Sequence, residues 1–302
     1  MTYLDLLGVQ MIATFSSRQS KSVARLISAS LGLMALLATT ISLTESASAA
    51  AVRIGVFNAN TLLANDDGST GAVGIGFSID FFGSTYSDLF VNNNGNVTFN
   101  AALGTFTPFN LLSTSTPIIA PFFADVDTRG SGSGIVSFGT GTVDGRTAFG
   151  VNWPGVGYFS NQTDKLNTFQ LVLIDRSDTG AGNFDIEFNY DQIQWETGDA
   201  SSGDNGLGGF SARVGYSNGV NTAFELPGSA INGAFLDGGS NSLIANRLNS
   251  TVDGRYVFQA RNGTVVNPDS IPTPALLPGL VGMGAMALRK RKAEAVEQES
   301  EA

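Results

Sequence analysis

The chain has 302 residues, of which 42% are hydrophobic and 14% are charged, with a formal net charge of -10 at pH 7. It contains no Cys and no His, which excludes disulfides, thiolate chemistry, His-based acid-base catalysis and His metal ligands. The negative charge argues against nucleic acid and anionic membrane surfaces as partners. The apolar fraction is sufficient for a sizeable core in one domain.

The first 49 residues are predicted to be a secretory signal peptide, cleaved by signal peptidase. Three basic residues precede an apolar run over 26–43: Arg18, Lys21 and Arg25. The small residues that place the cleavage site follow: Ala47, Ala49 and Ala50. Translation from Met11 would give a more typical signal, so the true start is expected there. The alternative interpretation of the apolar run is an uncleaved membrane anchor.

Residues 50–263 are predicted to form an all-β domain, an antiparallel β-sandwich. In the segment 72–82, apolar residues occupy every second position and so share one face: Val73, Ile75, Phe77, Ile79 and Phe81. Short strands with turn signals between them are predicted to follow at 96–99, 118–126, 134–138, 147–153, 168–175, 183–190, 210–216 and 255–261. No amphipathic helix of ten or more residues is expected in this region.

A polar turn and an acidic strand end are the most specific features of this domain. The turn Asn92-Asn93-Asn94-Gly95 tolerates positive φ and predicts a hairpin. Residues 81–99, FFGSTYSDLFVNNNGNVTF, and residues 118–139, IIAPFFADVDTRGSGSGIVSFG, resemble the nidogen-like extracellular domain. The resemblance covers 54–262 and implies a secreted matrix or cell-surface protein that acts in adhesion or scaffolding rather than in catalysis.

The acidic strand end also copies the start of a calcium loop, with Asp125 and Asp127 at its first and third positions. Arg129 then stands where a ligand belongs, and Val136 stands where the bidentate Glu belongs. The favoured interpretation is that the carboxylates accept backbone N–H bonds or pair with Arg129. We therefore assign no metal site and no cofactor, and keep Asp125 and Asp127 as candidate calcium ligands outside the EF-hand pattern.

Three segments are predicted to be loops because they are polar and rich in glycine: 128–134, 155–164 and 197–209. Trp153, Tyr158 and Phe159 lie next to the second loop. They form either a sugar-stacking platform or part of the core and its rim.

A pair of carboxylates gives the one enzymatic alternative. Asp185 and Glu187 lie on the same side of one predicted strand, roughly 7 Å apart, a spacing that glycosidases use when burial raises one pKa. The alternation around them predicts instead that they form the solvent-exposed face of an amphipathic strand.

The composition changes after the domain. A linker is predicted over 264–270, a sorting signal over 271–292 and an acidic tail over 293–302. The uncharged run 275–288 would be about 21 Å long as a helix, marginal for a hydrocarbon core of about 30 Å. It is predicted to be a short transmembrane helix, and the basic cluster after it would hold that end in the cytoplasm. The plain alternative is a short tail anchor.

This tail resembles the PEP-CTERM protein-sorting signal in its PTPA variant. The resemblance implies recognition by a membrane-embedded exosortase, transient inner-membrane anchoring, and release or attachment at the outer surface. The residues expected to be recognised are Pro272, Thr273, Pro274, Ala275, Arg289, Lys290 and Arg291. Thr273 replaces the usual Glu of the family, and the acidic tail is longer than usual.

Three functions from different classes therefore remain open. The first is an exported bacterial surface or matrix protein, not an enzyme, whose ligand is an extracellular polysaccharide or a surface protein. The second is a carboxylate-based hydrolase of matrix glycans, which requires a concave pocket with a buried acid. The third is a purely structural layer component that assembles with itself.

Overall fold

Two large antiparallel sheets form most of the part of the chain that the computed structural model describes, residues 50–266. The larger sheet has the order β1-β7-β8-β9-β10-β15-β16, with β6 paired to β8. Its strands are β1 (Asn60–Thr61), β6 (Val126–Asp127), β7 (Ser137–Val143), β8 (Arg146–Tyr158), β9 (Gln162–Asp175), β10 (Phe184–Gln192), β15 (Arg255–Arg261) and β16 (Thr264–Val266). β16 extends this sheet into the segment that we expected to be a linker.

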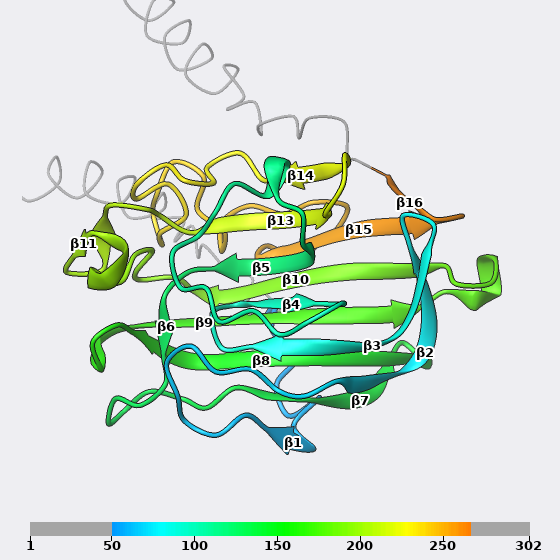
Figure 1. The fold of residues 1–302 in the computed structure, drawn as a ribbon, viewed down its shortest axis with the longest axis horizontal. Coiled ribbons are helices and arrows are strands. Elements are labelled where there is room, and N and C mark those ends of the chain that lie inside the picture. The colour runs from blue at the N-terminus through cyan, green and yellow to red at the C-terminus, as the bar shows by residue number, and fades with distance from the viewer. Residues whose placement is uncertain (1–49, 267–302) are drawn as a thin grey trace, which may run out of the picture. The chain divides into compact units, whose positions relative to one another are not determined.

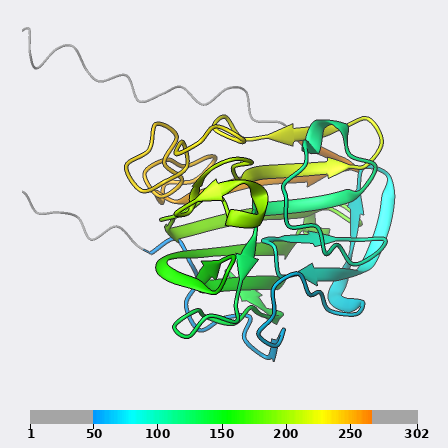
Figure 2. The same ribbon diagram turned by 60° about the vertical axis from the view of Figure 1, so that its left-hand side comes forward.

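The smaller sheet has the order β14-β13-β5-β4-β3-β2. Its strands are β2 (Val73–Phe81), β3 (Ser84–Asn92), β4 (Asn96–Thr98), β5 (Pro117–Phe123), β13 (Arg213–Asn218) and β14 (Ala223–Glu225). A separate ribbon joins β11 (Gly203–Asp204) to β12 (Leu207–Gly208). Figures 1 and 2 show the smaller sheet lying over one face of the larger one.

Helical structure within residues 50–266 is confined to three short 3-10 turns, at Leu111–Ser113, Ser177–Thr179 and Asp199–Ser201. The prediction of an all-β, antiparallel fold is confirmed. No helix in this described part is long and apolar enough to cross a membrane. The expected signal helix and the expected transmembrane helix lie outside the described residues.

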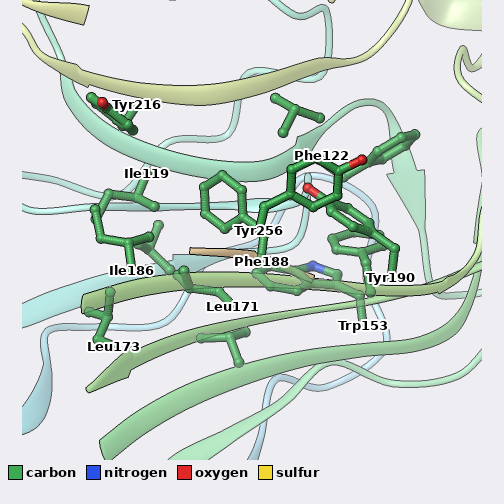
Figure 3. Packing of buried hydrophobic residues seen from close by; sticks show 14 of the residues in the cluster. Ile119, Phe122, Trp153, Leu171, Leu173, Ile186, Phe188, Tyr190, Tyr216 and Tyr256 are labelled. Carbon is green, nitrogen blue, oxygen red and sulfur yellow. The ribbon is translucent and has the colours of Figure 1, made fainter. Parts of the chain in front are cut away.

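The core lies between the two sheets and is rich in aromatic side chains (Figure 3). Ile119 and Phe122 of β5 face Leu171 of β9 and Phe188 of β10, and all four are fully buried. The predicted inner face of β2 is confirmed, since Ile75, Ile79 and Phe81 are buried and Val73 and Phe77 pack against the same core. Such interdigitation of two inner faces is typical of a β-sandwich.

Two segments differ from the prediction for identifiable reasons. Residues 155–164 are not a loop: they belong largely to β8 and β9, which pair from Ala148 with Ile174 up to Tyr158 with Gln162. Gly155 and Gly157 lie within β8 at the two places where its pairing with β9 shifts register, so they produce irregularities in a continuous strand and not a loop. β3 was missed because its first half is polar and exposed, so that no alternation marks it.

The outer face of the larger sheet is covered, contrary to the expectation of a wet face on β10. Residues 51–58 cross it, and the ring of Phe57 packs with Val172 and Ile174. A Cβ at Gly150 would collide with this ring, so glycine makes the close approach feasible. Apolar and polar residues do alternate along β10, but residues 51–58 cover the polar side of the strand.

The two carboxylates on this face are held by arginines. Arg53 donates to Glu187 through Nε at 2.8 Å and Nη2 at 3.0 Å. Arg176 and Arg261 donate to Asp185 at 2.7 and 2.5 Å. Both carboxylates are therefore buried and neutralised, which the sequence pattern did not indicate.

Candidate functional site

The turn between β3 and β4 is a buried cluster of asparagines, which we call the asparagine hub: Asn92, Asn93, Asn94 and Asn96. Each is at most 1% exposed. The predicted hairpin is confirmed, with Asn92 paired to Asn96. Gly95 has φ +72°, and a Cβ there would overlap the carbonyl oxygen of Phe122, so the turn can pack directly on β5 only with glycine at this position.

The hub fixes the turn at residues 65–68 through side-chain amides. Asn93 Nδ2 donates to the backbone oxygens of Asp66 and Val126, both at 2.5 Å. Asn94 Nδ2 donates to Asp67 Oδ1 at 2.8 Å, while Asn94 Oδ1 accepts from the Val126 N–H at 2.9 Å. The hub thereby holds the 65–68 turn against the break between β5 and β6.

Three carboxylates meet at this point, and we call them the acidic triad: Asp66, Asp67 and Asp125. One oxygen from each lies within 4.8 Å of the others. Asp125 is 1% exposed, and neither of its carboxylate oxygens has a hydrogen-bond partner. Asp66 Oδ1 is also buried without a partner.

This crowding changes the acidity of the triad. Burial, with added repulsion from Asp66 and Asp67, raises the pKa of Asp125 to about 7. Burial is also the main reason that the pKa of Asp66 is raised to about 6, and Asp127 and Asp67 add to it. The site therefore has excess negative charge that the protein compensates only in part.

Asp127 differs from Asp125 because its carboxylate is fully hydrogen-bonded. Arg129 donates to it through Nε at 2.9 Å and Nη2 at 2.7 Å, and the N–H groups of Arg129 and Asn161 donate at 2.9 and 2.8 Å. Burial alone would raise the pKa of Asp127, but the hydrogen bonds from Arg129 and Asn161 outweigh it and lower the pKa. The favoured interpretation of the acidic strand end thus describes Asp127 and fails for Asp125.

The 197–209 segment closes over Asp125. A Cβ at Gly198 would lie 2.5 Å from Asp125 Oδ2, so only glycine lets the chain lie this close to the carboxylate. The segment begins with the 3-10 turn Asp199–Ser201 and continues into the β11–β12 ribbon. Asp199 in that turn adds to the negative potential at Asp125.

The donor atoms decide what such a site can hold. Carboxylate oxygens suit hard cations such as calcium, magnesium or manganese. With neither His nor Cys in the sequence, no imidazole or thiolate donor is available. The carboxylate oxygens of Asp66, Asp67 and Asp125 could therefore hold such a cation.

The model of the nidogen-like domain matches residues 87–262, more than half of the chain. The chain belongs to the nidogen-like domain family. Asp125 lies inside the matched region, whereas Asp66 and Asp67 precede it.

Curated relatives support the same family. The nidogen-like chain is 34% identical to alpha-tectorin of Homo sapiens over 227 residues, which cover 67% of this chain and 10% of that protein. It is 32% identical to alpha-tectorin of Gallus gallus over 225 residues (65% and 10%) and 26% identical to nidogen of Drosophila melanogaster over 253 residues (75% and 17%). It thus aligns with only a small part of each relative's length. No solved structure matches it.

The sequence identified one member of the triad in this nidogen-like domain. Asp125 was a candidate calcium ligand, and its true neighbours Asp66 and Asp67 were missed. Their only signal was a pair of acids before Gly68 in a turn, and nothing in the sequence places that turn beside a residue almost sixty positions later.

Other candidate residues fall into two groups. Trp153 and Tyr158 are buried in the core, where the ring centroids of Trp153 and Phe169 are 4.9 Å apart, and Phe159 is half-buried. The alternative of core and rim residues is therefore confirmed over that of a sugar-stacking platform. Ala50 is the first described residue and is exposed. The remaining residues of the two processing signals lie outside the described part of the chain: Ala47, Ala49, Pro272, Thr273, Pro274, Ala275, Arg289, Lys290 and Arg291.

Proposed function

We propose that this protein is an exported cell-surface or extracellular-matrix protein that acts in adhesion or scaffolding through its nidogen-like domain. The observation that supports this most is the family match over 87–262, together with relatives named alpha-tectorin and nidogen. Its ligand would be an extracellular polysaccharide or a surface protein of neighbouring cells.

The proposed route to the surface uses both ends of the chain. Signal peptidase removes residues 1–49, and an exosortase-type enzyme recognises Pro272-Thr273-Pro274-Ala275 with the basic cluster at 289–291. The protein is anchored in the inner membrane only until this second cleavage. A bacterial source is part of this proposal, because the tripartite tail resembles a bacterial sorting signal.

The hydrolase alternative is weakened by the arginine pairs on β10. A glycosidase needs one carboxyl group that keeps its proton and another that is free to act. Asp185 and Glu187 instead each have arginine partners at 3.0 Å or less. These contacts support a structural role for both residues.

Intact mass spectrometry of the native protein from membrane, surface and medium fractions tests the route. We expect a species that begins near Ala50 and ends close to Pro274, outside the inner membrane. A chain that keeps its tail through Ala302 in the inner-membrane fraction would refute the sorting proposal.

Binding assays then separate adhesion from self-assembly. The purified mature protein is expected to sediment with extracellular polysaccharide or with cells of its own source, and to stay unassembled alone. Ordered assembly without any added ligand, and no binding to either material, would favour a structural layer component instead.

A further inference from the structure

The unpartnered carboxylate of Asp125 is unlike the other buried acids of this domain. Glu187 has Arg53, and Asp185 has Arg176 and Arg261. Asp125 is as deeply buried, yet neither of its oxygens has a hydrogen bond or an ion pair within the described chain. A buried carboxylate without compensation is costly, so its position calls for a cation.

The surroundings supply further ligands of the same type. Asp66 keeps Oδ1 free of protein partners while its Oδ2 pairs with Arg129 at 3.0 Å. Asp67 is oriented by the amide of Asn94 at 2.8 Å, as outer hydrogen bonds orient metal ligands. The one arginine at this point is shared with Asp127, so its charge cannot neutralise the triad.

We propose that Asp66, Asp67 and Asp125 bind one calcium ion, which ties the 65–68 turn to the end of β5. Calcium takes six to eight oxygens at about 2.3–2.6 Å, so two oxygens on opposite sides of the ion can be up to roughly 5 Å apart. The triad oxygens, all within 4.8 Å of one another, meet this limit. Magnesium requires about 2.0–2.1 Å and near-ideal octahedral geometry, and it fits less well.

The consequence is a domain whose loops depend on calcium. The ion would hold the 65–68 turn through the triad, and Gly198 brings the 197–209 segment against Asp125. This inference does not rest on the proposed adhesive function, because binding of the ion is measured without any ligand.

Calcium titration of the purified full-length protein, followed by calorimetry and by thermal unfolding, tests the site. At a free calcium concentration about 20 times the dissociation constant, we expect the unfolding midpoint to rise by roughly 4–7 °C over the protein in chelator. Magnesium at the same concentration is expected to give a smaller rise.

Two variants and one control identify the ligands. Asp125→Asn and Asp67→Asn are each expected to weaken calcium binding by a factor of about ten or more, because each removes one ligand charge. Asp88→Asn removes an exposed carboxylate on β3 and is expected to leave binding unchanged. Asp125→Asn is expected to remain folded in chelator, since it removes a buried charge.

Three results would overturn the proposal. They are the absence of binding heat with no rise in the midpoint, undiminished calcium binding in both triad variants, or an equal loss of binding in Asp88→Asn. If Asp125→Asn does not fold, Asp67→Asn still decides, because Asp67 is only partly buried.

Discussion

Replacing Asn93 by Asp tests the asparagine hub with almost no change in shape. The side-chain amide of Asn93 donates to the carbonyl oxygens of Asp66 and Val126 at 2.5 Å, and to that of Asn65 at 3.3 Å. A carboxylate in its place would present an acceptor to these three oxygens. The substitution therefore turns attraction into repulsion at a fully buried position.

The expected loss follows from the two short bonds. Each buried carbonyl that loses its donor costs about 1–3 kcal/mol, so the two together cost roughly 2–6 kcal/mol. A typical domain has a free energy of unfolding of about 5–15 kcal/mol. We therefore expect Asn93→Asp to lower the free energy of unfolding by roughly 2–6 kcal/mol, and the thermal midpoint by roughly 5–20 °C.

Equilibrium unfolding in urea at a fixed calcium concentration measures this loss. Trp153 is a suitable fluorescent probe, because its Nε1 donates to the backbone oxygen of Asn93 at 2.9 Å. Asn100→Asp is the control, since Asn100 is exposed and its variant should stay within about 0.5 kcal/mol of the parent. Equal free energies of unfolding for the two variants would refute the structural role of the hub.

Two further substitutions test close packing and buried hydrogen bonding by the same urea assay. Gly95→Ala should lower the free energy of unfolding by about 3 kcal/mol or more, because it adds a clash with the Phe122 carbonyl to the strain at φ +72°. The control Gly83→Ala, with φ +82° and open space around the new Cβ, should lower it by only about 1–2 kcal/mol. Equal losses in the two variants would exclude the clash. Glu196→Gln should lower the free energy of unfolding by about 1–3 kcal/mol. The buried carboxylate accepts from the N–H of Gly233 at 2.6 Å and from a second backbone N–H at 2.7 Å, and an amide has only one oxygen to offer. An unchanged urea midpoint would show that the amide satisfies both donors.

The fold could be predicted from the sequence wherever one face of a strand is apolar. Alternation placed the core face of β2, and β15 was predicted with the bounds Arg255–Arg261 that it has. The burial of the asparagine hub could not be predicted from such patterns. Short polar residues before glycine indicate a turn, but their burial depends on the distant 65–68 turn and on Val126.

The candidate site was predicted in part for the same reason. The acidic strand end drew attention to Asp125 and Asp127, whose roles differ because Arg129 reaches only one of them. Asp66 and Asp67 come to the site through the hub, a long-range contact that local sequence does not encode. The polar side of β10 was likewise covered by chain from far away in the sequence.

The pairing of distant strands also has a consequence for the timing of folding. β1 at residues 60–61 pairs with β7, and β5 at residues 117–123 finds its partner β13 only at residues 213–218. Contacts so far apart in sequence close slowly, typically over about milliseconds to seconds in all-β domains. The smaller sheet cannot be completed until most of the chain has been synthesised. A chain with this topology therefore remains unfolded for longer than one built from local contacts, and an unfolded chain can pass through a narrow channel.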